Sequence, residues 1–222
     1  MAARLALLGD IHANLPAFAA VLEAMDALGI RDAICTGDLV MRGNDPEECI
    51  ELLRRRGWPS VAGNTDVRVV NEPPRPKDHP ASVREGSRSW SIRHLSVRAL
   101  TYLAALPEQV RLTLDGHRIV AVHGHEQNGF APVDENSPDK LLLALAASLD
   151  ADCLVTGHTH RAFVRRIGPL LVVNPGGVGE SAGDDLRPSW AWLKVGPDGL
   201  EAHLERVGEP LARVRDRAST PG

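Results

Sequence analysis

The chain has 222 residues and a formal net charge of −4, with 43% hydrophobic and 24% charged residues. This length and composition are typical of one well-cored globular domain. The acidic balance argues against a nucleic-acid-binding face, and no apolar run approaches the roughly 20 residues of a membrane-spanning helix.

Two further features of composition predict a cytoplasmic protein. A first strand leads straight into Gly9 and Asp10, which leaves too little room for a signal peptide. The three cysteines, Cys35, Cys49 and Cys153, are odd in number and lack CxxC spacing. We therefore expect reduced thiols that act as small core residues.

The first part of the chain alternates expected strands and helices. Residues 4–9 form a buried strand, and Asn14 caps a helix that Gly29 ends. A second strand covers residues 32–36, a helix starts at Asp45-Pro46 and ends near Arg56, and a third strand covers residues 58–62. This order predicts βαβ units and a largely parallel sheet. The expected buried face of the first helix consists of Phe18, Val21, Leu22, Met25 and Leu28.

Residues 67–107 interrupt this pattern and are interpreted as an insertion. Residues 71–80 hold four prolines and predict a loop, whereas residues 83–106 look helical. The insertion either caps a functional site or is a plain surface excursion, and the sequence leaves both open. The apolar anchors of its helical part are Leu95, Leu100, Leu103 and Leu106.

The second half is richer in expected strands. A hairpin turns at Asp115-Gly116, and Ser137 with Pro138 predicts the start of a helix over residues 139–149. The remaining strands are expected at residues 152–156, 162–166, 170–173, 190–195 and 200–207, and residues 208–222 are expected to form a flexible tail. The fold class is therefore α/β, a single domain over residues 1–207 with two facing sheets and helices on their outer faces. The first half is expected to be largely parallel and the second more antiparallel.

Five loops share one layout, in which an apolar strand is followed by Gly or Asp and then by side chains that bind metals. Open α/β sheets place their sites at the carboxyl ends of strands, so these loops are expected to meet at one edge. The five sequences are Asp10-Ile11-His12, Gly37-Asp38, Gly63-Asn64, His123-Gly124-His125 and Gly157-His158-Thr159-His160.

These loops predict a metal site. Carboxylate, imidazole and amide ligands without thiolate suit Mn²⁺, Fe²⁺, Co²⁺, Ni²⁺ or Zn²⁺, with Mn²⁺ expected first. Seven candidates exceed the four ligands of a structural zinc and fit two ions that share a carboxylate. Two such ions, two aspartates and a bridging hydroxide leave a charge of about +1, which suits a phosphate ester. The candidates are Asp10, His12, Asp38, Asn64, His123, His158 and His160.

Several residues have simpler explanations when taken alone. Asp38 could be a turn residue, Asn64 could occupy a left-handed turn, and His125 could be a solvated loop side chain. The joint occurrence of five such loops makes coincidence a poor explanation. His94 lies in the insertion and would reach the site only if the insertion caps it.

The ordered motifs GDIHAN (9–14), GD (37–38), GN (63–64), HGH (123–125), GHTH (157–160) and NPGG (174–177) resemble those of the calcineurin-like metallophosphoesterases, in particular the small bacterial and archaeal phosphodiesterases. The resemblance implies a four-layer αββα sandwich of two mixed sheets with a dinuclear centre. It implies that Asp38 bridges the two ions and that His125 lies near the substrate phosphate. One ion would be held by Asp10, His12, Asp38 and His160, and the other by Asp38, Asn64, His123 and His158.

One motif departs from the family pattern. Many members follow the Asn of the third motif with a His that protonates the leaving group, whereas this chain has Thr65 and Asp66. Thr65 does not titrate near neutrality, so it cannot be that acid.

The sequence thus predicts a metal-dependent phosphoesterase, more a phosphodiesterase than a monoesterase. In the expected reaction a bridging hydroxide attacks phosphorus in line. The expected catalytic residues are Asp38, Asn64 and His125. The expected binding partner is a small phosphoester substrate, and neither nucleic acid nor a membrane is expected to bind. The sequence leaves open whether the protein forms an oligomer. The alternative is a protein-binding scaffold that keeps the fold without turnover.

Overall fold

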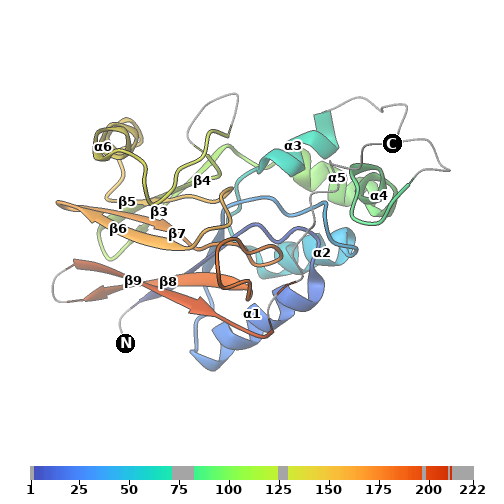
Figure 1. Ribbon diagram of the computed structural model, residues 1–222, viewed down its shortest axis with the longest axis horizontal. Helices are drawn as coiled ribbons and strands as arrows, with labels where there is room; N and C mark the ends of the chain where they lie inside the picture. Colours follow the sequence, from blue (N-terminus) through green and yellow to red (C-terminus); the bar gives the residue numbers. More distant parts are fainter. Residues whose placement is uncertain (1–2, 72–82, 125–129, 197–198, 210, 212–222) are drawn as a thin grey trace.

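The computed structural model describes residues 3–71, 83–124, 130–196, 199–209 and 211. Two β-sheets lie face to face, and helices cover their outer sides (Figure 1). The strands are β1 (Arg4–Leu8), β2 (Ala33–Cys35), β3 (Gln109–Leu114), β4 (His117–Val122), β5 (Cys153–Val155), β6 (Phe163–Ile167), β7 (Leu170–Asn174), β8 (Ser189–Gly196) and β9 (Gly199–Arg206). The helices in the described ranges are α1 (Leu15–Ala27), α2 (Pro46–Arg56), α3 (Asn64–Asn71), α4 (Arg88–His94), α5 (Val97–Ala104) and α6 (Asp139–Ser148).

Both sheets are mixed, which confirms the predicted fold class. The first has the order β2-β1-β8-β9 and the second the order β3-β4-β5-β7-β6. Among the described strands of the first sheet, β1 and β2 pair parallel, whereas β8 pairs antiparallel with both β1 and β9 and so lies beside the first strand of the chain. The expectation of a largely parallel first half and a more antiparallel second half is confirmed, because β1 and β2 are parallel whereas β3–β4, β6–β7 and β8–β9 are antiparallel pairs. The parallel pairs of the second sheet are β4 with β5 and β5 with β7.

Strand β1 shows how period-2 alternation builds the layers. Leu5 and Leu7 point into a core between the sheets, which Ile119, Val155 and other second-sheet residues share. Ala6 and Leu8 point the other way, into a second core with helices α1 and α2. A third core joins the outer face of the second sheet to helix α6. Because β1 is buried on both sides from Leu5 to Leu8, its residues there are apolar throughout rather than alternating with polar ones.

The third expected strand, residues 58–62, does not form a regular strand. It has a single parallel bridge, between Cys35 and Ser60, flanked by backbone hydrogen bonds from Cys35 N to Pro59 O and from Val61 N to Cys35 O. The neighbouring Ala62 N donates instead to Pro107 O, so the segment leaves the ladder after one register position. Pro59 also has no N–H to donate, which shortens any ladder that contains it.

The insertion is helical where it is described, with bounds that differ from the prediction. Helix α3 begins already at Asn64, and the expected helix over residues 83–106 is broken between α4 and α5 at Leu95 and Ser96. Ser96 caps α5 by accepting from Ala99 N. Leu95 and Leu103 are buried in the first-sheet core, while most of the predicted 71–80 loop lies outside the described residues.

Smaller local predictions had mixed outcomes. Asn14 caps α1 as expected, but Leu28 follows the helix and is 40% exposed. Asp45 occupies the N-cap of α2 without a side-chain bond. Pro138 rather than Ser137 precedes α6, because the Ser137 hydroxyl bonds within its own loop. Most of the 208–222 tail lies outside the described residues.

None of the described helices has both the length and the apolar character that crossing a bilayer requires.

Candidate metal centre

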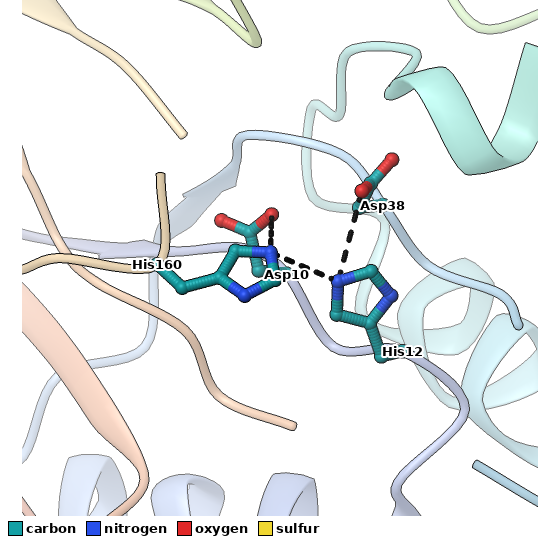
Figure 2. A group of neighbouring side chains, drawn as sticks. All are labelled: Asp10, His12, Asp38 and His160. Carbon is teal, nitrogen blue, oxygen red and sulfur yellow. Dashed lines mark hydrogen bonds and ion pairs between the residues drawn. The ribbon is translucent and has the colours of Figure 1, made fainter. Parts of the chain in front are cut away.

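Four of the predicted ligands meet at the carboxyl ends of the strands, as Figure 2 shows. Their ligand atoms all lie within 4.8 Å of one another, and their residues are between 0% and 7% exposed. Asp10 and His12 follow β1, Asp38 follows β2, and His160 follows β5. We call this set the inner group: Asp10, His12, Asp38 and His160.

The contacts of the inner group run between ring nitrogens and carboxylate oxygens. His160 Nε2 lies 3.1 Å from His12 Nε2 and 3.3 Å from Asp10 Oδ1. His12 Nε2 lies 3.6 Å from Asp38 Oδ2. The ligand atoms thus face a common centre (Figure 2).

The remaining predicted ligands form a second set beside the first, which we call the outer group: Asn64, His123 and His158. Asn64 Oδ1 lies 3.1 Å from His123 Nε2 and 2.9 Å from His158 Nδ1. His123 Nε2 also lies 3.5 Å from Asp38 Oδ1, so Asp38 borders both groups. Asn64 and His158 are half-buried, whereas His123 is buried.

Backbone carbonyls fix which ring nitrogens face these groups. His123 Nδ1 lies 2.7 Å from Thr36 O, and His12 Nδ1 lies 3.4 Å from Val40 O. A carbonyl only accepts, so each Nδ1 carries the proton and each Nε2 of a neutral ring presents a lone pair. This is the usual outer contact of a metal-binding histidine.

This arrangement fits divalent cations. Ring lone pairs and carboxylate oxygens converge in a buried space where a positive charge would relieve their repulsion. Asp10 Oδ1 is buried and has no hydrogen bond, an arrangement that costs free energy unless another group binds the oxygen. The chain therefore offers a site for divalent metal.

Burial and neighbouring charges shift the ionisation of the histidines. Burial lowers the pKa of His12 well below its usual value and also lowers the pKa of His158. Burial alone would lower the pKa of His160 too, but the carboxylates of Asp10 and Glu180 outweigh it and raise this pKa. His12 and His158 are thus held in the neutral form that binds metals.

The ligands sit on strained backbone. Asp10, His12, Asp38, His158 and His160 all have positive φ, between 49° and 70°. Non-glycine residues rarely adopt this conformation, and it costs of order 1–3 kcal/mol each where it is imposed. The loops turn sharply after each strand and bring side chains that follow separate strands to one point. Secondary-structure propensity alone does not predict this convergence.

The residues that replace the expected acid have structural roles. Thr65 N donates to Asp38 Oδ1 at 2.8 Å, and Thr65 Oγ1 donates to Val40 O. Asp66 accepts from the backbone N–H groups of Asp38, Leu39 and Gly63. Burial and the nearby Asp38 charge nevertheless raise the pKa of Asp66 to about 7. Asp66 therefore joins two ligand loops, a role that its sequence position did not indicate.

Close backbone approach explains a glycine next to Asn64. A Cβ on Gly63 would lie 2.2 Å from both the backbone N and Oδ1 of Asp38. Only glycine allows the two loops to approach this closely.

The structure does not test every predicted residue. His125 lies outside the described residues. His94 is on α4, where its ring stacks on Trp90 with centroids 3.9 Å apart, and it is not in the inner group.

A two-sheet α/β sandwich that gathers aspartate and histidine side chains at the carboxyl ends of its strands is an architecture that can hold a metal centre. Residues 3–196 match the model of the calcineurin-like phosphoesterase superfamily domain, and the chain belongs to this family.

Individual relatives support this membership. A metallophosphoesterase from Sphaerobacter thermophilus of known structure is 27% identical, with a TM-score of 0.73 over 94% of this chain and 89% of that one. An uncharacterized protein of Methanocaldococcus jannaschii is 27% identical over 196 residues, covering 79% of this chain and 76% of that protein. The 3',5'-cyclic adenosine monophosphate phosphodiesterase of Pseudomonas aeruginosa is 30% identical over 109 residues, which cover 43% of this chain and 40% of that enzyme.

Proposed function

We propose that the chain is a metal-dependent phosphodiesterase with a dinuclear centre, with Mn²⁺ as the first expected ion and Fe, Ni, Co or Zn as alternatives. The inner group would hold one ion. Asp38 together with the outer group would hold the other, so that Asp38 bridges them. The observation that carries the proposal is the convergence of ring lone pairs on buried carboxylates, with Asp10 Oδ1 left without a hydrogen bond.

The chemistry would follow from this arrangement. Divalent ions held by the inner and outer groups would supply positive charge for the phosphoryl oxygens and would activate a water for in-line attack on phosphorus. The protein fixes the ligand rings through Thr36 O and Val40 O and leaves the outer group partly open to solvent. The Thr65 hydroxyl is too weak an acid to protonate the leaving group. We therefore expect the hydrolysis rate to fall steeply as the leaving group becomes a stronger base.

The substrate class is a small phosphoester. The relative from Pseudomonas aeruginosa is named for hydrolysis of 3',5'-cyclic adenosine monophosphate, which makes this cyclic diester a reasonable member of a substrate panel. The diester preference rests on the resemblance to the small phosphodiesterases.

Elemental analysis and a substrate panel test the proposal together. The Mn²⁺-loaded protein should contain two ions per chain and cleave bis(p-nitrophenyl) phosphate faster than p-nitrophenyl phosphate. Cyclic adenosine monophosphate belongs in the same panel. An absence of turnover on all three, together with unchanged metal content in Asp38→Ala and His158→Ala, would overturn it. A stable protein partner without turnover would favour the scaffold alternative.

A further inference from the structure

Glu180 links a ligand of the inner group to an arginine beside it. Its Oε1 lies 3.8 Å from His160 Nδ1, on the opposite side of the ring from the nitrogen that faces Asp10. Its other oxygen, Oε2, forms an ion pair with Arg42 Nη1. The Glu180 side chain is 21% exposed, so the contact with His160 is only partly screened by water.

The backbone around Glu180 is fixed against the ligand loops. Val178 N donates to Gly9 O, and Gly179 N donates to Asp10 O at 2.8 Å. Ala182 N donates to His160 O on the other side of Glu180. A Cβ on Gly179 would lie 1.8 Å from Ile11 O. The segment is therefore held at a fixed distance from the loops that carry Asp10 and His160.

Arg42 is held just as firmly. Its φ is +72°, and its N donates to Gly86 O. The preceding Met41 N donates to the buried hydroxyl of Ser91 on α4. A Cβ on Gly86 would lie 2.1 Å from Arg42 O, so the insertion and the Asp38 loop are in close backbone contact. The insertion thus fixes Arg42 in the position from which it reaches Glu180.

We propose that Glu180 is a positioning residue for His160, orienting the imidazole so that Nδ1 carries its proton and Nε2 presents a lone pair to a metal ion in the inner group. This inference rests on the proposed function. At Nδ1, His160 has the Glu180 carboxylate at an ion-pair distance of 3.8 Å, where His12 and His123 have a backbone carbonyl at 3.4 Å and 2.7 Å. Arg42 balances the charge of Glu180, whereas the backbone hydrogen bonds on either side of Glu180 keep its carboxylate beside the ring. Outer contacts of this kind are worth about 10–100-fold in metal affinity.

The first experiment measures Mn²⁺ affinity of the full chain by competition with a fluorescent chelator. Glu180→Gln should weaken the tighter binding event about 10–100-fold. Glu51→Gln is the matched control, because Glu51 has a 24% exposed side chain and pairs with Arg54 on α2. It should leave Mn²⁺ affinity unchanged, and circular dichroism should show both variants folded.

A double-mutant cycle separates positioning from simple charge balance. If Glu180 acts through His160, Glu180→Gln should still weaken Mn²⁺ binding in an Arg42→Met background. If the loss disappears in that background, Glu180 only neutralises Arg42 and the proposal is wrong. Nitrogen-15 spectra of the Zn²⁺-loaded protein give a second test. The His160 Nδ1–H proton should move upfield in Glu180→Gln, and an unmoved resonance would contradict the proposal.

His160→Ala distinguishes failure of this inference from failure of the proposed function. If the wild-type protein binds no Mn²⁺, or if His160→Ala leaves the affinity unchanged, the metal centre itself is wrong. If His160→Ala weakens binding while Glu180→Gln does not, the centre stands and the role of Glu180 is refuted.

Discussion

The inner and outer groups of the centre differ in burial and in how their side chains are held. The inner ligands are at most 7% exposed and face one another within 4.8 Å. In the outer group Asn64 and His158 are half-buried, and one amide oxygen lies against both rings. The desolvated inner charges need a cation more than the outer ones do. We therefore expect the inner group to bind the tighter ion and the outer group to meet solvent and substrate.

The largest expected effect is at the residue that both groups share. Asp38→Asn keeps the size of the side chain and removes a negative charge that both ions would use. We expect Mn²⁺ content to fall below one ion per chain and turnover of bis(p-nitrophenyl) phosphate to fall roughly 10³-fold, equivalent to several kcal/mol. Asp45→Asn is the control, because Asp45 makes no side-chain cap bond. Normal activity in Asp38→Asn would show that Asp38 does not bridge.

Replacing one histidine from each group separates the two sites. His160→Ala should abolish the tighter of two Mn²⁺ binding events in calorimetry, because it opens the buried inner group. His158→Ala should weaken the second event and leave the tighter one little changed, because His158 is not among the four residues of the inner group. Equal losses at both events in both variants would mean that the groups form one inseparable site.

Metal removal should lower stability through the inner group. An ion present at 100 times its dissociation constant stabilises the folded state by about 2.7 kcal/mol. For a chain of this size we expect the thermal midpoint to drop by about 5–10 °C after chelation and to recover on adding Mn²⁺. Scanning calorimetry checks this, and His160→Ala should show a much smaller shift. An unchanged midpoint would contradict tight binding in the buried group.

A smaller effect is expected where the two groups approach at Gly63. Gly63→Ala places a Cβ against the backbone and carboxylate of Asp38, which should cost about 1–3 kcal/mol of unfolding free energy. Gly196→Ala is the control, because its Cβ would meet only the movable end of the Glu201 side chain. We expect Gly196→Ala to lower the free energy of unfolding, measured by urea denaturation, by less than about 0.5 kcal/mol. Equal costs at the two positions would show that the Asp38 loop relaxes freely.

The smallest expected effect concerns the strands that lead into the two groups. Cys35 ends β2 and Cys153 begins β5, and burial raises the pKa of both thiols, that of Cys153 to about 12. Burial raises the pKa of Cys49 as well. The native protein at pH 8 should therefore not react with Ellman's reagent, whereas three thiols should react after unfolding. Rapid reaction of the metal-free native protein would show that the strands open together with the centre.

The sequence predicted the fold class because strands such as β1, β2 and β5 are short, largely apolar runs with a turn signal after each. It did not predict the order of the first sheet, in which β8 lies between β1 and β9. Pairing between distant strands depends on how whole layers pack, which local periodicity does not encode. Residues 58–62 show the same limit, since a strand-like composition was overridden by a hydrogen bond from Ala62 N to Pro107 O.

What the sequence determined by itself was a set of candidate ligand residues, because a metal requires particular side chains and strands deliver them at their ends. The structure brings the four residues of the inner group together and places Asn64 beside His123 and His158, and their binding of metal stays a prediction. Only the tertiary structure decided which ring nitrogens face inward, through Thr36 O and Val40 O. It also supplied Asp66, Arg42 and Glu180, whose contacts join loops far apart in the chain. These roles arise from left-handed turns and close backbone approach, properties of the packed molecule rather than of any single segment.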